Sequence, residues 1–354
     1  MILQRYLLRQ VVLSFLFTFA VVLAVFLVGL SFQVFRAYSS IGMGMIVRII
    51  PLATAGAAAW AVLLAISPSV TLVYGRLSAD NEIDAMRISG IATRRMVTPA
   101  LLFGLLVSAG TYGILEFAVP QASYARRVLI REFSVALLQS PPPGKQHFAF
   151  GTFALSYLDS AGGVMQMPYL TEYEGMRIKT EYTALTAKAQ VEEGGNVRLL
   201  MNKWTAMNHD ASGRVTLASA ENEFTIDLNL NEILKPDKRA DNLRTREMIK
   251  EWRNEPDPRK RNWMLTSLYS RFGQSLAPFC LVVIAVPIGI MVRRGSRLAG
   301  MGAALPPLLL YLVLFFLFRG MGDNGRVPAP VAAFAPDAIL LAIGSGLLLR
   351  VCRR

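Results

Sequence analysis

Six long apolar runs dominate the hydrophobic pattern of the chain. Each has at least about 20 residues, enough for a helix rising 1.5 Å per residue to cross the hydrocarbon core of a bilayer. They fall in two groups of three, with a long segment of different character between the groups. The pattern therefore predicts six membrane-spanning helices in a 3 + 3 arrangement, at residues 11–35, 49–72, 96–119, 268–292, 298–318 and 331–351.

The segment between the two groups, residues 120–265, alternates apolar and polar positions over short stretches such as RVTLASAENEFTIDLNL. Period-two alternation broken by Gly-rich turns is typical of antiparallel strands. The turn signals lie at residues 160–163, 193–196 and 210–213. We expect a β-sandwich or jelly roll that starts after the spacer at 141–144 and ends in a polar segment, 235–261, with a short helical pattern at 243–252.

Composition places the chain in a membrane. Of its 354 residues 53% are hydrophobic and only 17% are charged, and the mean hydropathy is +0.41. An ordinary soluble domain is far less apolar. The net charge of +13 could indicate nucleic-acid binding, but that function needs basic residues gathered on a soluble surface. Here every lysine lies between Lys145 and Lys260, and the excess positive charge comes from arginines in short loops.

The distribution of those arginines predicts the orientation, because positive charge in short loops stays on the cytoplasmic side. The short loops and ends on one side of the spans are poor in arginine and hold only Arg36, Arg48, Arg319 and Arg326. Those on the other side are rich in arginine and hold Arg5, Arg9, Arg76, Arg87, Arg94, Arg95, Arg293, Arg294, Arg297, Arg350, Arg353 and Arg354. We therefore expect a multi-pass inner-membrane protein with both termini in the cytoplasm and residues 120–265 in the periplasm.

The sequence offers no catalytic constellation. Its two histidines, His147 and His209, are isolated within predicted strands, and neither Cys280 nor Cys352 accompanies them at metal-ligand spacing. Gly144-Lys145 lacks the further glycine and the hydroxyl residue of a phosphate-binding loop. We expect neither a bound cofactor or metal nor a nucleotide site of the chain's own.

The first arginine-rich loop, RLSADNEIDAMRISGI, contains a predicted short helix at about residues 80–90. Asp80 is expected to cap a helix that begins at Asn81, with Glu82 and Asp84 in the first turn, where the helix dipole favours acid. Gly90 suits the left-handed backbone conformation that commonly ends a helix. So short a helix is marginal alone and needs a surface to pack against.

One face of this predicted helix carries Ile83 and Met86, with Glu82 beside them. It could rest on the bilayer or on the protein's own helices, or it could dock on a cytoplasmic partner. Arg87 lies near the end of the helix.

Charged residues also lie where the spans end away from the arginine-rich loops: Arg36, Arg48, Glu116, Arg271, Arg319 and Asp337. One interpretation is snorkelling with ion pairing between neighbours. The other is that some of the arginines bind an anionic lipid headgroup, since guanidinium and phosphate form a bidentate pair. The candidates are Arg36, Arg48 and Arg271.

Three features resemble one family, the YjgP/YjgQ permeases, which are the LptF and LptG subunits of the lipopolysaccharide exporter. They are EIDAMRISGI at residues 82–91, PIGIMVRRGSRLAGMG at residues 287–302, and the 3 + β + 3 arrangement of the whole chain. The resemblance implies transmembrane helices in residues 1–119, a periplasmic β-jelly roll in 120–265 and transmembrane helices in 266–354.

The resemblance also implies partners. A cytoplasmic ABC ATPase dimer would use ATP and receive the short helix as a coupling helix, with Glu82, Ile83, Met86 and Arg87 as its coupling residues and Glu82 paired with an arginine of the ATPase. A second LptF/LptG-type permease, a periplasmic β-jelly-roll bridge protein and lipopolysaccharide complete the system. This chain has Arg36 and Arg48 where G-type members have lysines, which leaves F-type and G-type both open.

Other functions fit the same plan. The chain could transport another lipid or a lipoprotein, or serve as a non-transport assembly factor whose β domain holds periplasmic partners. A membrane enzyme is disfavoured because catalytic residues are lacking.

Overall fold

The computed structural model describes most of the chain, in eight segments, and divides into two compact units. The first unit comprises Met1–Leu30, Ala53–Ala122 and Ala240–Arg354, and the second comprises Ser31–Leu52 and Ser123–Arg239. The described residues are 2–38, 43–150, 152–174, 177–191, 197–209, 214–228, 243–292 and 297–353.

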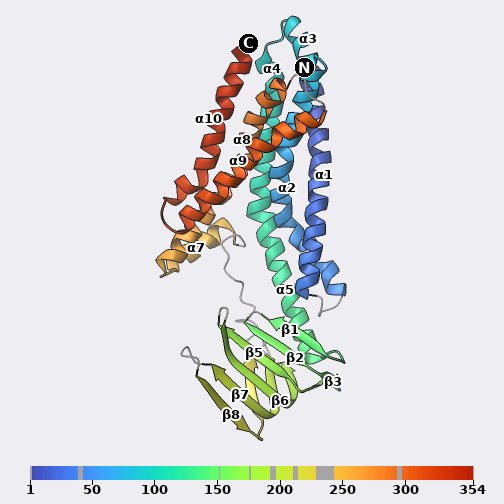
Figure 1. Ribbon diagram of the computed structural model, residues 1–354, viewed down its shortest axis with the longest axis vertical. Coiled ribbons are helices and arrows are strands. Elements are labelled where there is room, and N and C mark those ends of the chain that lie inside the picture. Colours follow the sequence, from blue (N-terminus) through green and yellow to red (C-terminus); the bar gives the residue numbers. More distant parts are fainter. Residues whose placement is uncertain are drawn as a thin grey trace. The chain divides into compact units, whose positions relative to one another are not determined.

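In the part of the chain that the structure describes, six helical segments are long and apolar enough to cross a membrane. An antiparallel sheet is inserted between the third and the fourth (Figure 1). This confirms the fold class expected from the apolar runs. The long helices are α1 (Ile2–Tyr38), α2 (Met43–Ala79), α4 (Thr93–Gly113), α8 (Pro258–Met291), α9 (Arg297–Asp323) and α10 (Ala329–Arg353). Among the described residues, two short helices, α3 (Glu82–Ile88) and α7 (Thr245–Asn254), lie between them in the chain.

The third helical segment is longer than its apolar run. After α4 the chain passes through a π-helical turn, η2 (Ile114–Ala118), into α5 (Val119–Gln139), whereas the sequence pattern ended this span at residue 119. This extension carries polar residues, so the hydropathy pattern did not predict it as part of a membrane span. It is helical because its apolar side is covered within the second unit, where Ile130 and Phe133 pack against Val34 and Ile49.

Helix α8 forms the centre of the first unit and packs against α4, α9 and α10. Its contact with α10 depends on glycine at two levels. A Cβ on Gly273 would clash with the carbonyl oxygen of Ala333, and one on Gly344 would lie 3.0 Å from the backbone nitrogen of Ile284. Gly344 of the last span and Gly273 of α8 therefore serve close helix packing.

The inserted sheet is built around two long strands, β6 (Arg177–Val191) and β7 (Val197–His209), which pair along eleven positions. The strand order is β1-β2-β5-β6-β4-β3, and β7 also pairs with β8 and β9. The other strands are β1 (Gln146–Phe150), β2 (Phe153–Tyr157), β3 (Asp159–Ala161), β4 (Val164–Gln166), β5 (Tyr169–Glu174), β8 (Val215–Ala220) and β9 (Phe224–Leu228).

The predicted turns of the sheet are partly visible. Gly162 and Gly163, both with positive φ, reverse the chain between β3 and β4 as expected. The turns predicted at 193–196 and 210–213 lie outside the described residues. At the start of the sheet, Asp159 accepts a hydrogen bond from the backbone N–H of Gly144 at 2.7 Å, which lowers the pKa of this carboxyl. The helical pattern predicted at 243–252 is confirmed as α7.

Candidate functional site

The short helix α3 lies at one end of the first unit, beside the start of α1 and the end of α10 (Figure 1). We call this side of the unit the α3 end. The sequence predicted Asp80 as its N-cap, and that prediction was wrong. Asp80 instead donates its backbone N–H to Arg76 and closes the last turn of α2. Asn81 is the residue that turns the chain, at φ 59°, a left-handed conformation that Asn tolerates better than most residues.

The end of α3 is a Schellman motif, as the glycine predicted. Gly90 has φ 79°, and its N–H donates to the carbonyl oxygen of Arg87 at 3.0 Å. The N–H of Ile91 donates to the carbonyl oxygen of Met86, also at 3.0 Å. These two bonds satisfy carbonyl groups that the helix would otherwise leave without partners. Both ends of α3 are therefore fixed by the local sequence.

The apolar face of α3 packs on the protein's own helices. Ile83 is only 3% exposed and belongs to the main hydrophobic core, and Met86 packs against that core. The core also contains Leu77 from the end of α2 and Met96 from the start of α4. Of the two alternatives for this face, packing within the chain is therefore the one that the structure shows.

Arg87 ties α3 to two spans. Its Nε donates to Thr93 Oγ1 at 3.2 Å, at the start of α4, and its Nη2 donates to the carbonyl oxygen of Val351 at 3.1 Å, near the end of α10. Asp84 lies 3.9 Å from the guanidinium group. A displacement of α3 would therefore pull directly on α4 and α10.

The outward side of α3 carries an apolar residue that the sequence analysis did not single out. Ile88 is 89% exposed, the opposite of Ile83 on the same helix. At about 100° per residue, Ile88 lies roughly 200° around the helix from Met86, so a helical projection would have found it. Glu82 is partly exposed, and one of its oxygens accepts a hydrogen bond from the Tyr6 hydroxyl at 3.2 Å.

A second charged cluster lies at the start of α7. Arg271 of α8 donates from Nη1 to Glu116 Oε2 at 2.9 Å and from Nη2 to the carbonyl oxygen of Leu243 at 2.6 Å. Glu116, in the π-helical turn η2, also accepts from the backbone N–H of Thr245 at 3.2 Å and from its hydroxyl at 2.5 Å. The ion pair thus holds the first turn of α7 against α8 and η2.

The three lipid-headgroup candidates fall in different surroundings. Arg271 is only 5% exposed and is bonded to protein groups, which favours the ion-pairing interpretation of this residue over lipid binding. Arg36 and Arg48 are exposed, near the end of α1 and the start of α2. They flank a small hydrophobic cluster of the second unit that includes Val34 and Ile49.

Metal-ligand geometry is not found in the part of the chain that the structure describes, where no three His, Cys, Asp or Glu side chains gather. The two histidines have separate surroundings. His147 Nδ1 lies 3.0 Å from Ser156 Oγ, and His209 Nε2 lies 3.5 Å from Glu181 Oε2.

Comparison with known proteins identifies the family. The family model described as lipopolysaccharide export system permease LptF/LptG matches residues 5–350, almost the whole chain. No curated protein matches the chain. The motif at residues 82–91 lies in α3 and its turn, whereas residues 293–296 of the second motif lie outside the described residues. Members of the family are transmembrane subunits without an ATPase domain. The chain therefore belongs to the LptF/LptG family of lipopolysaccharide export system permeases.

Proposed function

We propose that the chain is one of two paired permease subunits of an inner-membrane exporter that passes lipopolysaccharide to a periplasmic β-jelly-roll bridge protein. A separate cytoplasmic ATPase dimer hydrolyses ATP, and this chain couples that hydrolysis to its spans. Membership in the LptF/LptG family supports lipopolysaccharide as the substrate. The excess of arginine at the α3 end supports placing that end in the cytoplasm, where ATP is available.

The observation that carries the coupling role is the division of α3 into an anchored face and an exposed one. Ile83 and Arg87 fix the helix to the core and to two spans. Ile88 is presented outward, and an exposed large apolar side chain at a helix end is a suitable anchor for a partner's pocket. A push on Ile88 would therefore be transmitted by a short, firmly attached helix.

The coupling residues expected from the sequence divide between two roles in this proposal. Glu82 remains a candidate contact, because a carboxylate at the rim of α3 can pair with an arginine of the ATPase. Ile83, Met86 and Arg87 act as positioning residues that hold α3 in place. Ile88 joins Glu82 as the apolar part of the contact.

Two substitutions at Ile88 test the contact. Ile88→Asp should abolish co-purification with the ATPase and lipopolysaccharide-stimulated ATP hydrolysis in the intact complex, because a charge replaces the apolar anchor. Ile88→Met keeps size and polarity and should retain both. Equal membrane levels of the two variants exclude a folding defect. Unchanged co-purification and hydrolysis in Ile88→Asp would show that Ile88 is not the contact.

Arg36 and Arg48 are the lipid-facing candidates that remain. Both are exposed, and each directly follows an exposed apolar residue, Phe35 or Val47, an arrangement suited to a phosphorylated lipid headgroup with acyl chains next to it. A photo-crosslinker at either position should label with lipopolysaccharide in cells. Leu310 on α9 is a matched apolar control, since its side chain is 39% exposed. Labelling no stronger than at Leu310 would remove both arginines from the lipid path.

A further inference from the structure

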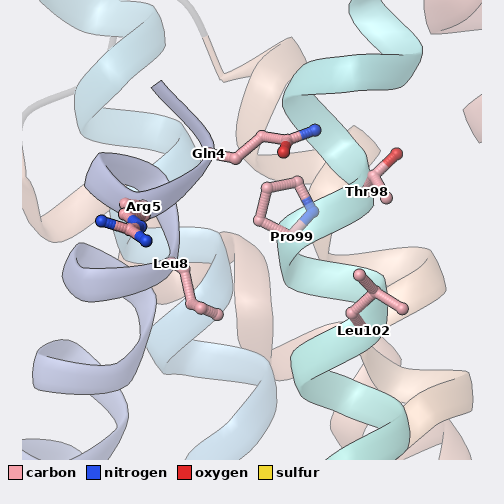
Figure 2. A pocket seen from close by; sticks show the side chains of 6 residues that line it. All are labelled: Gln4, Arg5, Leu8, Thr98, Pro99 and Leu102. Atoms are coloured by element: carbon pink, nitrogen blue, oxygen red, sulfur yellow. The ribbon is translucent and has the colours of Figure 1, made fainter. Parts of the chain in front are cut away.

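An open groove lies between α1 and α4 at the α3 end of the first unit (Figure 2). It has a volume of about 250 Å³. Its walls are Gln4, Arg5 and Leu8 from α1 and Thr98, Pro99 and Leu102 from α4. Deeper along the same two helices, the rings of Phe15 and Phe103 meet with centroids 5.3 Å apart. The helices are therefore in contact beyond the groove and separate at its level.

The walls change from polar to apolar in the same direction on both helices. Each helix begins at the α3 end, so Gln4, Arg5 and Thr98 come first and Leu8 and Leu102 lie about one turn further along (Figure 2). The leucines are not core residues. Leu102 is 61% exposed and Leu8 is 38% exposed. This order of polar and apolar groups matches a lipid that lies along the helices with its headgroup toward the α3 end.

The mouth of the groove is positively charged. Within the described part of the chain, Arg5 takes part in neither an ion pair nor a side-chain hydrogen bond. Arg9 follows one turn later on α1, and the exposed Arg94 and Arg95 stand at the start of α4. An anionic group at the mouth would therefore meet an uncompensated guanidinium group, with three further arginines nearby.

We propose that this groove binds an anionic phospholipid of the adjacent leaflet. Arg5 binds the phosphate, Gln4 and Thr98 lie beside the headgroup, and an acyl chain lies on Leu8 and Leu102. Basic pockets between helices on the cytoplasmic side of membrane proteins are suited to anionic headgroups. The site is separate from the lipopolysaccharide candidates Arg36 and Arg48, which lie at the other ends of their helices.

The position of the groove suggests a consequence for α3. Tyr6, the residue after Arg5, donates to Glu82 of α3, and Gln10 accepts a hydrogen bond from Arg76 at 2.7 Å. A lipid between α1 and α4 would fix the start of α1 at the level where α1 contacts α3. Anionic lipid should therefore stabilise the arrangement of the coupling helix.

Native mass spectrometry of the full-length chain in detergent tests the site, with phosphatidylglycerol or phosphatidylcholine of identical acyl chains. We expect the anionic lipid to be retained preferentially. Arg5→Gln should reduce its binding about tenfold, since the lost bond joins two charged groups. Arg350→Gln, at an exposed arginine of α10 outside the groove, should leave it unchanged. Equal losses in the two variants, or no preference between the lipids, would overturn the proposal.

Two competitors identify the occupant. Inorganic phosphate at matched concentration should not displace phosphatidylglycerol, because it lacks the acyl chain that contacts Leu102. Leu102→Gln should in turn weaken phosphatidylglycerol binding even though Arg5 is intact. If phosphate displaces the lipid, the groove is a simple anion site. If lipopolysaccharide displaces phosphatidylglycerol from the wild-type protein but not from the Arg36→Gln variant, the phosphatidylglycerol occupies the lipopolysaccharide path rather than a separate site. Either displacement contradicts the proposal, whereas failure of lipopolysaccharide transport leaves it untouched.

Discussion

Helices α3 and α7, the two short helices among the described residues of the first unit, are attached to the long helices in different ways. Helix α3 is held by the apolar burial of Ile83 and by Arg87, which donates to a hydroxyl and to a carbonyl oxygen. In α7, Met248 is buried, but the first turn is held by the Glu116–Arg271 ion pair. Neither helix is long enough to be stable alone. The attachment therefore decides how each of them can fail.

The difference follows from what each helix must leave free. Helix α3 is held by the burial of Ile83 and by bonds from Arg87 to neutral oxygen atoms, which leaves Glu82 and Ile88 available to a partner. Helix α7 is held by a buried charge pair, which is strong only while both members are present. We therefore expect α3 to tolerate surface changes with its stability intact, and α7 to be sensitive to the loss of a single charge.

The largest effect should come from breaking the ion pair at α7. Arg271→Met leaves Glu116 buried without its cation, and such losses cost about 3–5 kcal/mol. Unfolding in mixed detergent micelles should show this destabilisation, and limited proteolysis should cut near α7 more readily. Arg48→Met, at an exposed arginine, should have little effect on either measurement.

The companion double variant separates the pair from general packing. Replacing Glu116 by Leu together with Arg271→Met removes both charges and should restore much of the stability, since replacing a buried pair by apolar groups is often neutral. A double variant as unstable as Arg271→Met alone would mean that hydrogen bonds to Thr245 and Leu243 hold α7, and that the charge pair itself contributes little.

At α3 the corresponding change is loss of apolar burial. Ile83→Ala creates a cavity in the core and should destabilise the protein by about 2–5 kcal/mol. Ile88→Ala, the same substitution five residues later, should change stability by less than about 0.5 kcal/mol because the site is exposed. Its effect should appear in coupling to the ATPase instead. Similar losses of stability in both variants would refute the division of α3 into an anchored and a free face.

Local pattern predicted the elements well. Six apolar runs, the strand alternation and Gly90 each depend on neighbours within a few residues, so their signals are present in the sequence. Asp80 failed as a cap for a physical reason: the end of α2 and the start of α3 share residues 79–82, and Asp80 is used to finish the first helix. A local reading of either helix alone misses this competition.

Long-range pairing was not predictable in the same way. Arg271 has the charge and the depth expected of a lipid-binding arginine, and its partner Glu116 lies 155 positions away. Nothing in either segment specifies that they meet. Likewise, Ile83 and Met86 form an apolar stripe that would look the same against a partner or against the protein's own core. Only the fold decides between those alternatives.

The smallest of the expected effects concerns the C-terminal end of α3. Gly90 has φ 79° and no atom would meet an added Cβ, so Gly90→Ala tests backbone strain without a steric clash. A left-handed alanine costs roughly 1–2 kcal/mol, which should appear as a modest loss of stability in the same micelle unfolding measurement. Gly110→Ala is the control, since it lies within α4 with equal space and ordinary helical φ. It should be neutral or slightly stabilising, because alanine is the better helix former. If Gly90→Ala is also neutral, the Schellman turn is dispensable, and the packing of Ile83 and the bonds of Arg87 alone suffice to position α3.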